Sequence, residues 1–293
     1  KFPFLKILTR FTAMSSMTPK IDSAGEGFIQ PPIKLPNAYI DDTILQSILA
    51  RLLENQNGRR FLVCGDLEKF GEKVVNELDV LADECEMYPP SLQQFDVVGN
   101  RIDTIHTCAA WKQMHKISAA EGLVGFGYNA HREALCEFAR VHQFAKLHLY
   151  SPASGMYNCP LAMTDGAAKL IENLPEDIKK TTGEALQRLT SGCGDKFWTS
   201  GQWMTERAGG SDVANGTRTV ARLHADGTYR LWGYKWFTSA IDCDVTITLA
   251  RIEDKDGKTV SGNHIIMFKR SMYVVMESVC EQFCGSSFYF VQA

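Results

Sequence analysis

The apolar residues in the first 190 positions follow the spacing of helices. Between residues 44 and 53 they recur at i, i+1, i+4 and i+5, which places them on one helical face. Asp41-Asp42 is suited to cap this helix, Asn57-Gly58 is expected to end it, and Pro89-Pro90 is expected to end the next one. The pattern predicts an all-α bundle, with further helices at about residues 66–87, 105–121, 131–150, 160–173 and 176–190.

The spacing changes to strict alternation after residue 216. Residues 217–223 and 229–232 alternate between apolar and polar side chains, and the turn signal at residues 225–228 predicts a β-hairpin between them. Residues 245–250 are predicted to form another strand, followed by a turn at residues 254–258. A helical part followed by a sheet indicates an α+β protein.

Composition narrows the class of protein further. The chain has 293 residues, of which 45% are hydrophobic and 22% are charged, and its net charge is −3. These values are ordinary for a soluble globular protein. The sequence contains no run rich in Lys and Arg, and no apolar run approaches the ~20 residues of a membrane span. We therefore expect neither nucleic-acid binding nor a membrane span.

The cysteines and the first residues bear on the compartment. The nine cysteines are scattered, so we interpret them as reduced residues of an intracellular protein. Residues 1–20 are basic and contain no acidic residue, which is typical of a mitochondrial transit segment. A mitochondrial or cytoplasmic location is expected. The start at Lys1 suggests that the N-terminus is incomplete or includes translated leader sequence.

Motifs for several other chemistries are missing from the sequence. The seven histidines form no H-E-x-x-H pattern, so no metal site is predicted. The glycines at residues 122–127 do not match G-x-G-x-x-G, and neither G-x-x-x-x-G-K-[ST] nor G-x-S-x-G occurs. We expect these glycines to end a helix or to allow close packing.

The segment from Gln202 to Val213 is the strongest functional signal. It combines the hydroxyls of Thr205 and Ser211 with the adjacent Gly209-Gly210, which allow positive φ and a close approach of the backbone to a ligand. Such donors suit the polar edge of a flavin ring, where negative charge develops during hydride transfer. The alternative is a glycine-rich turn before a strand. Glu206-Arg207 is interpreted as a solvated pair, and Asp212 as an acceptor for loop amides.

A second segment at residues 233–239 complements the first. Trp236-Phe237 provides aromatic faces that can pack on a planar ring, and Thr238-Ser239 provides hydroxyls for its polar edge. The alternative is that the aromatic side chains belong to the core of a strand.

Together these segments resemble the flavin-binding middle domain of the acyl-CoA dehydrogenase family. Residues 204–213 have the form M-T-E-x-x-G-G-S-D-V and residues 235–239 the form K-W-F-x-S, which are similar to the AidB-like branch of that family. Residues 157–164 resemble its C-P-x-x-M-T segment. The resemblance covers roughly residues 36–250.

The resemblance implies FAD as the cofactor and a helical domain, a β-barrel-like domain and a C-terminal four-helix domain. We expect an irregular tail at residues 1–35, the helical domain at 36–195 and an incomplete flavin-binding β domain at 196–269. Residues 270–293 depart from the family pattern, and the chain is expected to be truncated before the C-terminal domain.

By the resemblance, the full-length form would oxidise the Cα–Cβ bond of an acyl-CoA, use an electron-accepting flavoprotein or oxygen, and form a homo-oligomer. Ser211 would also contact substrate, and no residue is assigned as the catalytic base. The alternative is a catalytically incompetent fragment that binds at most flavin or an acyl chain. A nucleic-acid-associated flavoprotein gains no support from the charge. The implied cofactor-binding residues are Gln202, Trp203, Met204, Thr205, Gly209, Gly210, Ser211, Phe237, Thr238 and Ser239.

Overall fold

A computed structural model describes residues 33–225, 229–253, 257–259, 264–269 and 290–291. The predicted basic leader and most of the predicted atypical segment at 270–293 lie outside these ranges. Residues 36–293 form one compact unit, which contains all of the elements named below.

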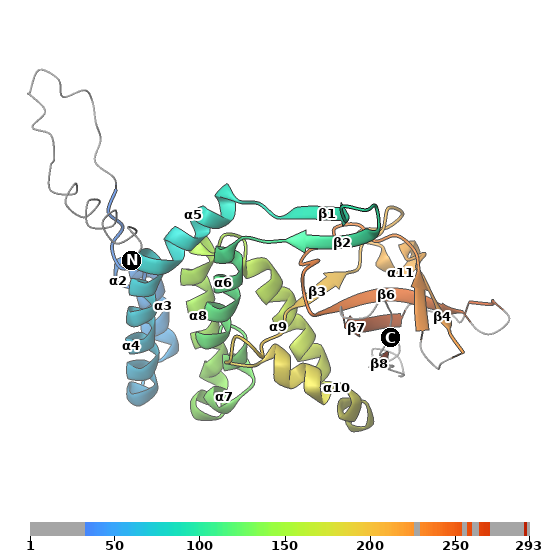
Figure 1. Ribbon diagram of the computed structural model, residues 1–293. Helices are drawn as coiled ribbons and strands as arrows, with labels where there is room; N and C mark the ends of the chain where they lie inside the picture. Colours follow the sequence, from blue (N-terminus) through green and yellow to red (C-terminus); the bar gives the residue numbers. More distant parts are fainter. Residues whose placement is uncertain (1–32, 226–228, 254–256, 260–263, 270–289, 292–293) are drawn as a thin grey trace, which may run out of the picture. The chain divides into compact units, whose positions relative to one another are not determined.

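Helices make up most of the first part of this unit, as the apolar spacing predicts (Figure 1). Most of them surround one apolar core, to which α3, α4, α6 and α8 each contribute buried side chains. The helices are α2 (Ala38–Asp41), α3 (Thr43–Leu52), α4 (Asn57–Lys73), α5 (Asp79–Met87), α6 (Ala109–Ala120), α7 (Ala130–Leu135), α8 (Ala139–Tyr150), α9 (Asn158–Glu172) and α10 (Glu176–Leu189).

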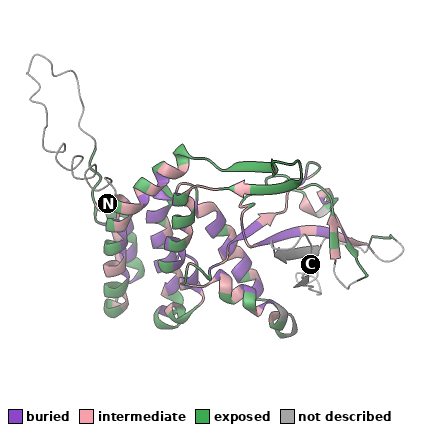
Figure 2. Ribbon diagram, in the orientation of Figure 1, coloured by how far each residue is buried: buried purple, intermediate pink, exposed green. Residues whose placement is uncertain are grey.

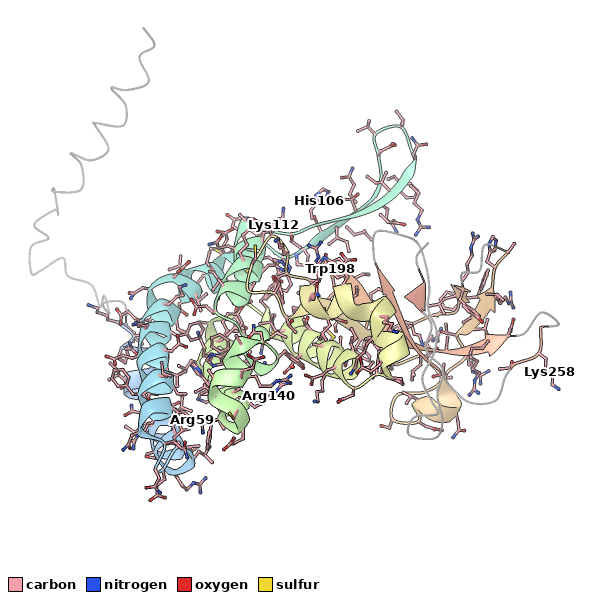
Figure 3. All side chains as sticks on the ribbon, turned by 90° about the horizontal axis from the view of Figure 1, so that it is seen from below. Arg59, His106, Lys112, Arg140, Trp198 and Lys258 are labelled. Carbon is pink, nitrogen blue, oxygen red and sulfur yellow. The ribbon has the colours of Figure 1, made fainter. Side chains whose placement is uncertain are left out.

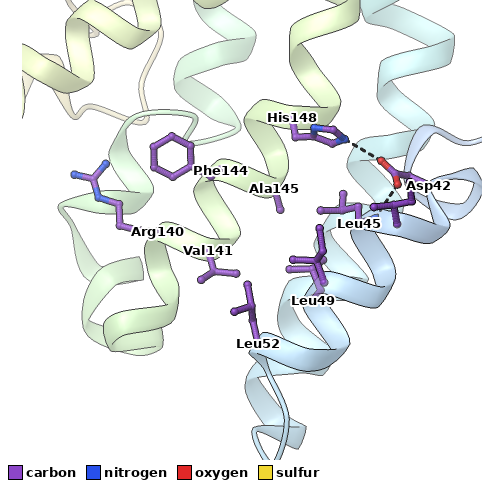
Figure 4. A pocket seen from close by; sticks show the side chains of 11 residues that line it. Asp42, Leu45, Leu49, Leu52, Arg140, Val141, Phe144, Ala145 and His148 are labelled. Atoms are coloured by element: carbon purple, nitrogen blue, oxygen red, sulfur yellow. Dashed lines mark hydrogen bonds and ion pairs between the residues drawn. The ribbon is translucent and has the colours of Figure 1, made fainter.

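The predicted cap of the first long helix is confirmed. The Asp42 carboxylate accepts a hydrogen bond from the Leu45 backbone N–H at 2.8 Å at the start of α3. Only part of the apolar stripe is buried, however, because Ile44 and Leu52 face solvent. They line an open pocket of about 550 Å³ between α3 and α8, where His148 contacts Asp42 at 2.9 Å (Figure 4).

The prediction that Asn57-Gly58 ends a helix is wrong. Helix α3 ends at Leu52, Asn55 in the connection adopts a φ of 63°, and Asn57 is the first residue of α4. From there the chain stays helical through α5, with one π-helical turn, η1, at Val74–Leu78. The second helix therefore begins about two turns before the predicted position at residue 66.

A β-hairpin interrupts the helices between α5 and α6. Strands β1 (Ser91–Phe95) and β2 (Arg101–His106) pair antiparallel, and Gly99 with a φ of 91° lies in the turn. Most of their side chains are exposed (Figure 2), so the hairpin has no alternation of buried and exposed residues that would predict it. The helix expected near residue 105 consequently begins at Ala109.

The second part of the unit is a mixed sheet, which confirms the predicted α+β order. The order along the sheet is β5-β4-β6-β7-β8, and β3 also pairs with β6; within the described residues the sheet does not close into a barrel. The predicted hairpin is formed by β4 and β5. The strands are β3 (Ser200–Trp203), β4 (Val220–Leu223), β5 (Tyr229–Trp232), β6 (Val245–Glu253), β7 (His264–Lys269) and β8 (Phe290–Val291).

Helices α9 and α10 join the helical part to the sheet. Ala167 and Ile171 of α9 share a buried apolar cluster with Val245 and Ile247 of β6. Figure 3 labels Trp198, which lies in the segment between α10 and β3. The packing of α9 against β6 fixes the place of β3, which pairs with β6, and β3 in turn positions the loop that follows it.

A group of charges surrounds one buried lysine in the helical part. The Lys146 side chain is 1% exposed, and its ammonium lies 2.9 Å from Asp66 and 2.8 Å from Glu121. Lys73 also contacts Glu121, at 2.6 Å. Burial opposes ionisation of Asp66, but a hydrogen bond from His142 and the charge of Lys146 outweigh it and hold the pKa of Asp66 at about 2. These groups therefore depend on Lys146 for charge balance.

Candidate functional site

The structure brings the two predicted segments into direct contact. Strand β3 ends at Trp203, and the loop that follows runs to the short helix α11 (Val213–Gly216). The Trp236 backbone N–H donates to the Thr205 carbonyl at 2.9 Å, and the Trp203 indole N–H donates to the Ser239 carbonyl at 3.0 Å. Residues more than 30 positions apart in the sequence thus form one surface.

A buried ion pair fastens these loops together, so the interpretation of Glu206 as a solvated residue is wrong. The Glu206 side chain is only 5% exposed and that of Lys235 only 11%. The Lys235 ammonium donates to Glu206 Oε1 at 2.7 Å and to the Leu249 carbonyl at 2.8 Å. The carboxylate also accepts hydrogen bonds from the backbone N–H groups of Arg218 and Thr219 and from the Thr219 hydroxyl. Of the two adjacent charged residues, Glu206 is buried and Arg207 is exposed.

Burial shifts the pKa values of the two residues of this pair in opposite directions, because it disfavours both charged forms. Burial raises the pKa of Glu206, but the hydrogen bonds from Lys235, Thr219 and Arg218 outweigh it, and the net pKa lies below the ordinary value. Burial lowers the pKa of Lys235 more than Glu206 raises it. The difference has a physical cause: the carboxylate has three further donors to replace water, whereas the ammonium has one further acceptor.

The two adjacent glycines have different roles: the positive φ expected from the sequence is absent at both, and open space for a ligand is present only at Gly210. Neither Gly209 nor Gly210 has a φ in the left-handed region. A Cβ at Gly209 would lie 2.7 Å from the Gly216 Cα and 2.8 Å from the Asp212 carbonyl oxygen, whereas a Cβ at Gly210 would meet nothing within 4 Å. Gly209 is thus required for packing of backbone on backbone, and Gly210 leaves open space above the loop.

These geometries predict opposite outcomes for a matched pair of substitutions. Gly209→Ala is expected to destabilise the protein by about 1–3 kcal/mol, because the backbone must shift to admit a methyl group. Gly210→Ala is expected to be neutral or to stabilise by up to about 1 kcal/mol, because it restricts the unfolded chain without a clash. Urea unfolding of both variants measures the difference. Equal effects would contradict this arrangement of the loop.

Four hydroxyl groups on the two loops are available to a ligand. The hydroxyls of Thr205, Ser211, Thr238 and Ser239 make no hydrogen bond to any residue in the described part of the chain. Thr205 and Thr238 are half-buried, while Ser211 and Ser239 are exposed. Hydroxyls are both donors and acceptors, so this set can meet a polar ligand edge.

The aromatic residues of the second segment do not belong to the core. Tyr234, Trp236 and Phe237 are 87%, 55% and 75% exposed. The Trp236 and Phe237 rings meet edge to face, with centroids 6.0 Å apart. Phe237 has a φ of 57°, a left-handed conformation that costs a bulky residue about 1–3 kcal/mol and often occurs at ligand sites. The core alternative for these rings is therefore wrong.

The remaining residues predicted from the sequence are held by contacts within the protein. Met204 packs against the apolar cluster between α9 and the sheet. The Trp203 ring nitrogen is committed to Ser239, and the Gln202 amide lies where a Cβ at Gly166 would be 2.7 Å away. The Asp212 carboxylate accepts from the Asn215 backbone N–H at 3.2 Å, which confirms its predicted role.

A pocket beside the loops contains residues that the sequence did not identify. It has a volume of about 450 Å³, and Ile241 and Asp242 lie on its wall next to Ser239. The Trp111 indole N–H donates to the Asp242 carboxylate at 2.7 Å, which ties this wall to α6. The C-P-x-x-M-T segment was the available signal, because its Cys159 and Pro160 line the same pocket.

Metal sites and membrane spans were both sought in the structure. In the described ranges, no three His, Cys, Asp or Glu side chains are grouped as possible metal ligands. His142 contacts Asp66 and His148 contacts Asp42 instead. Across those ranges, helices long and apolar enough for a membrane span are also lacking.

Comparison with known sequences identifies relatives over most of the chain. The family model described as the adaptive response protein AidB N-terminal domain matches residues 29–191. Acyl-CoA dehydrogenase family member 11 of Caenorhabditis elegans is 45% identical over 239 residues, which are 81% of this chain and 38% of that protein. The putative acyl-CoA dehydrogenase AidB of Escherichia coli K12 is 29% identical over 231 residues, which are 76% of this chain and 41% of that protein.

Solved structures give the same picture. The crystal structure of Caenorhabditis elegans ACDH-11 in complex with C11-CoA matches with a TM-score of 0.77 and 41% identity, over 88% of this chain and 43% of that one. The structure titled Bd2924 apo-form matches with a TM-score of 0.73 and 39% identity, over 83% of this chain and 48% of that one. The chain thus spans less than half the length of each of these relatives.

Proposed function

The chain belongs to the acyl-CoA dehydrogenase family, in its AidB-like branch, and on this basis we propose that its two facing loops bind FAD in an oxidoreductase that acts on an acyl-CoA thioester. The observation that carries the proposal is the contact between residues 203–211 and 234–239, which combines unpaired hydroxyls with exposed aromatic faces.

The residues present fit the chemistry of a flavin. An isoalloxazine ring has one polar edge, which the hydroxyls of Thr205, Thr238 and Ser239 could meet, and two flat faces, which Trp236 and Phe237 could cover. The open space above Gly210 allows a close approach of a ligand to the backbone. When bound, FAD would supply the hydride acceptor for oxidation of a Cα–Cβ bond.

The chain's own groups would hold and orient this cofactor. The Glu206–Lys235 pair keeps the loops at a fixed separation, so that hydroxyls from both loops can converge on one ligand. Ser211, at the exposed end of the first loop, is proposed to contact the cofactor or the substrate. The catalytic base stays unassigned, and the electron acceptor, a flavoprotein or oxygen, and assembly into a homo-oligomer stay predictions.

An acyl-CoA is the substrate class that we propose. The relative with a TM-score of 0.77 is described as a complex with C11-CoA, and the apolar pocket beside Ser239 adjoins the proposed ring site. The test is anaerobic titration of the purified yellow protein with acyl-CoA thioesters, followed by visible absorbance. Bleaching supports the oxidoreductase. Bound flavin that no acyl-CoA bleaches supports the alternative of a binding-only chain, and a colourless protein that takes up no FAD contradicts the proposal.

Removal of one hydroxyl and one aromatic face should weaken FAD binding. The double variant Thr205→Ala/Phe237→Ala loses a hydrogen bond and an aromatic contact, together about 1–3 kcal/mol, so the Kd for FAD should rise about tenfold or more. Fluorescence titration with FAD measures this change. Phe61→Ala on α4 is a matched control, because Phe61 is 80% exposed and belongs to neither loop. Unchanged affinity in the double variant would contradict the site.

A further inference from the structure

Two thiols meet at the base of the β1–β2 hairpin. Cys85 lies near the end of α5, just before the hairpin, and Cys108 is the N-cap residue of α6, just after it. Their sulfur atoms are 3.9 Å apart, within contact distance. In the described structure, this contact between sulfur atoms links the two ends of the hairpin at its base.

We propose that Cys85 and Cys108 form a reversible disulfide that locks the base of the β1–β2 hairpin, with a low-molecular-weight disulfide such as glutathione disulfide as the oxidant. Of the other thiols in the described residues, Cys136 and Cys193 are exposed, Cys243 is buried next to Thr246, and Cys64 and Cys159 are half-buried. Only for Cys85 and Cys108 does the described structure show a thiol in contact with a second thiol.

The local geometry allows the bond to form. A disulfide requires sulfur atoms about 2.05 Å apart, so one side chain must move toward the other. Cys85 is backed by Gly155, where an added Cβ would lie 2.7 Å from the Cys85 Cβ. Cys108 lies in the non-helical connector between β2 and α6, which His106 and Lys112 bracket in Figure 3. Cys108 is therefore the residue that moves.

An oxidant can reach both sulfur atoms. Cys85 and Cys108 are half-buried and line the pocket of about 450 Å³ that opens beside Asp242. In an intracellular protein, a dithiol of this kind is normally reduced and forms a disulfide only transiently. The pocket gives this pair the access that a fully buried pair would lack.

The two cysteines have different roles in the exchange. Burial and the neighbouring Cys108 raise the pKa of Cys85 to about 12, so Cys85 is poorly suited to attack first. The Cys108 sulfur accepts a hydrogen bond from the Trp111 backbone N–H at 3.4 Å at the start of α6, so a backbone donor already faces this sulfur. We therefore assign Cys108 as the attacking thiol and Cys85 as the resolving thiol.

The thiol–disulfide exchange with glutathione disulfide takes place in two steps. The Cys108 thiolate attacks one sulfur of glutathione disulfide, which forms a mixed disulfide and releases one glutathione thiolate. The Cys85 thiol then loses its proton to solvent and attacks the Cys108 sulfur, and the second glutathione leaves. The protein is oxidised by two electrons, and one glutathione disulfide is reduced to two glutathione thiols.

Peptide mapping of the purified full chain tests the proposal. The protein is equilibrated with mixtures of reduced and oxidised glutathione, quenched in acid, alkylated and digested with trypsin without reduction. Cys85 and Cys108 fall in separate peptides, residues 74–101 and 102–112, because trypsin cuts after Arg101. We expect these peptides to appear as one linked species, which increases with the share of oxidised glutathione and separates on reduction.

Two variants assign the order of attack. Cys85→Ser should trap glutathione on Cys108, whereas Cys108→Ser should leave Cys85 almost unmodified over the same time. Cys193→Ser is the matched control with an exposed thiol, and it should give the same linked species as the wild type. A link from either cysteine to residues 147–169, which contain Cys159, or separate glutathione adducts in the wild type, would overturn the proposal.

Discussion

Glu206→Ala is expected to destabilise the protein by about 3–5 kcal/mol, because it leaves the Lys235 ammonium buried without a counterion. It also removes the acceptor for the Arg218 and Thr219 backbone N–H groups. Both loops of the candidate site are fastened through this one carboxylate. Urea unfolding measures the loss, and on the proposed function FAD retention should decrease with it.

Two further variants separate the buried charge from a general effect of truncation. Adding Lys235→Met to Glu206→Ala removes the unpaired charge, so the double variant should be more stable than Glu206→Ala alone. Glu184→Ala is the surface control, because Glu184 is 62% exposed and pairs with Arg188 within α10; it should change stability by less than about 0.5 kcal/mol. If Glu184→Ala and Glu206→Ala had the same effect, the pair would not fasten the loops.

Lys146→Met is expected to cost about 2–3 kcal/mol, since Asp66 and Glu121 lose the cation between them but keep His142 and Lys73 as partners. Methionine fills a similar volume, so the loss of stability reflects the missing charge rather than a cavity. Chemical unfolding of the variant at neutral pH measures it. Lys116→Met is the control, because the Lys116–Asp195 pair is 58% and 79% exposed, and it should be nearly neutral.

The pH dependence of this loss identifies its origin. The folded pKa of Asp66 is about 2 and the ordinary value is 3.8, so its stabilising contribution is present above pH 3.8 and is lost as the pH falls through 2. The pKa of Glu121 is likewise held below its ordinary value of 4.5, by Lys146 and Lys73 against the effect of burial. The difference in the free energy of unfolding between wild type and Lys146→Met should therefore have its full size above about pH 4.5 and should decrease below that pH. A difference that does not change with pH would indicate lost packing instead.

The sequence predicted which segments of the candidate site meet, but not how they are held. Hydroxyls and aromatics at residues 205–211 and 236–239 could be recognised from their chemistry alone. The burial of Glu206 could not, because its partners are Arg218 and Thr219, just before β4, and Lys235, which are distant in the sequence. The packing of Gly209 on Gly216 likewise depends on how the loop folds back on itself.

The fold shows the same division between local and long-range information. The helical stripe and the Asp42 cap rest on neighbouring residues, and both could be read from the sequence. The turn at Asn55 uses a left-handed conformation that no local apolar pattern encodes, so the start of α4 was misplaced. The hairpin at residues 91–106 buries little and therefore lacks the alternation from which strands are recognised.

The parallel pairing of β3 with β6 has a consequence for the order of folding. Trp203 and Thr248 are 45 positions apart, and the two loops of the site lie at the ends of this connection. Closing such a long loop costs chain entropy before any contact between the strands stabilises it, whereas the helices form from near neighbours. We therefore expect the helical part to become structured first. The surface that faces the proposed cofactor would then be assembled last, on a scaffold that already exists.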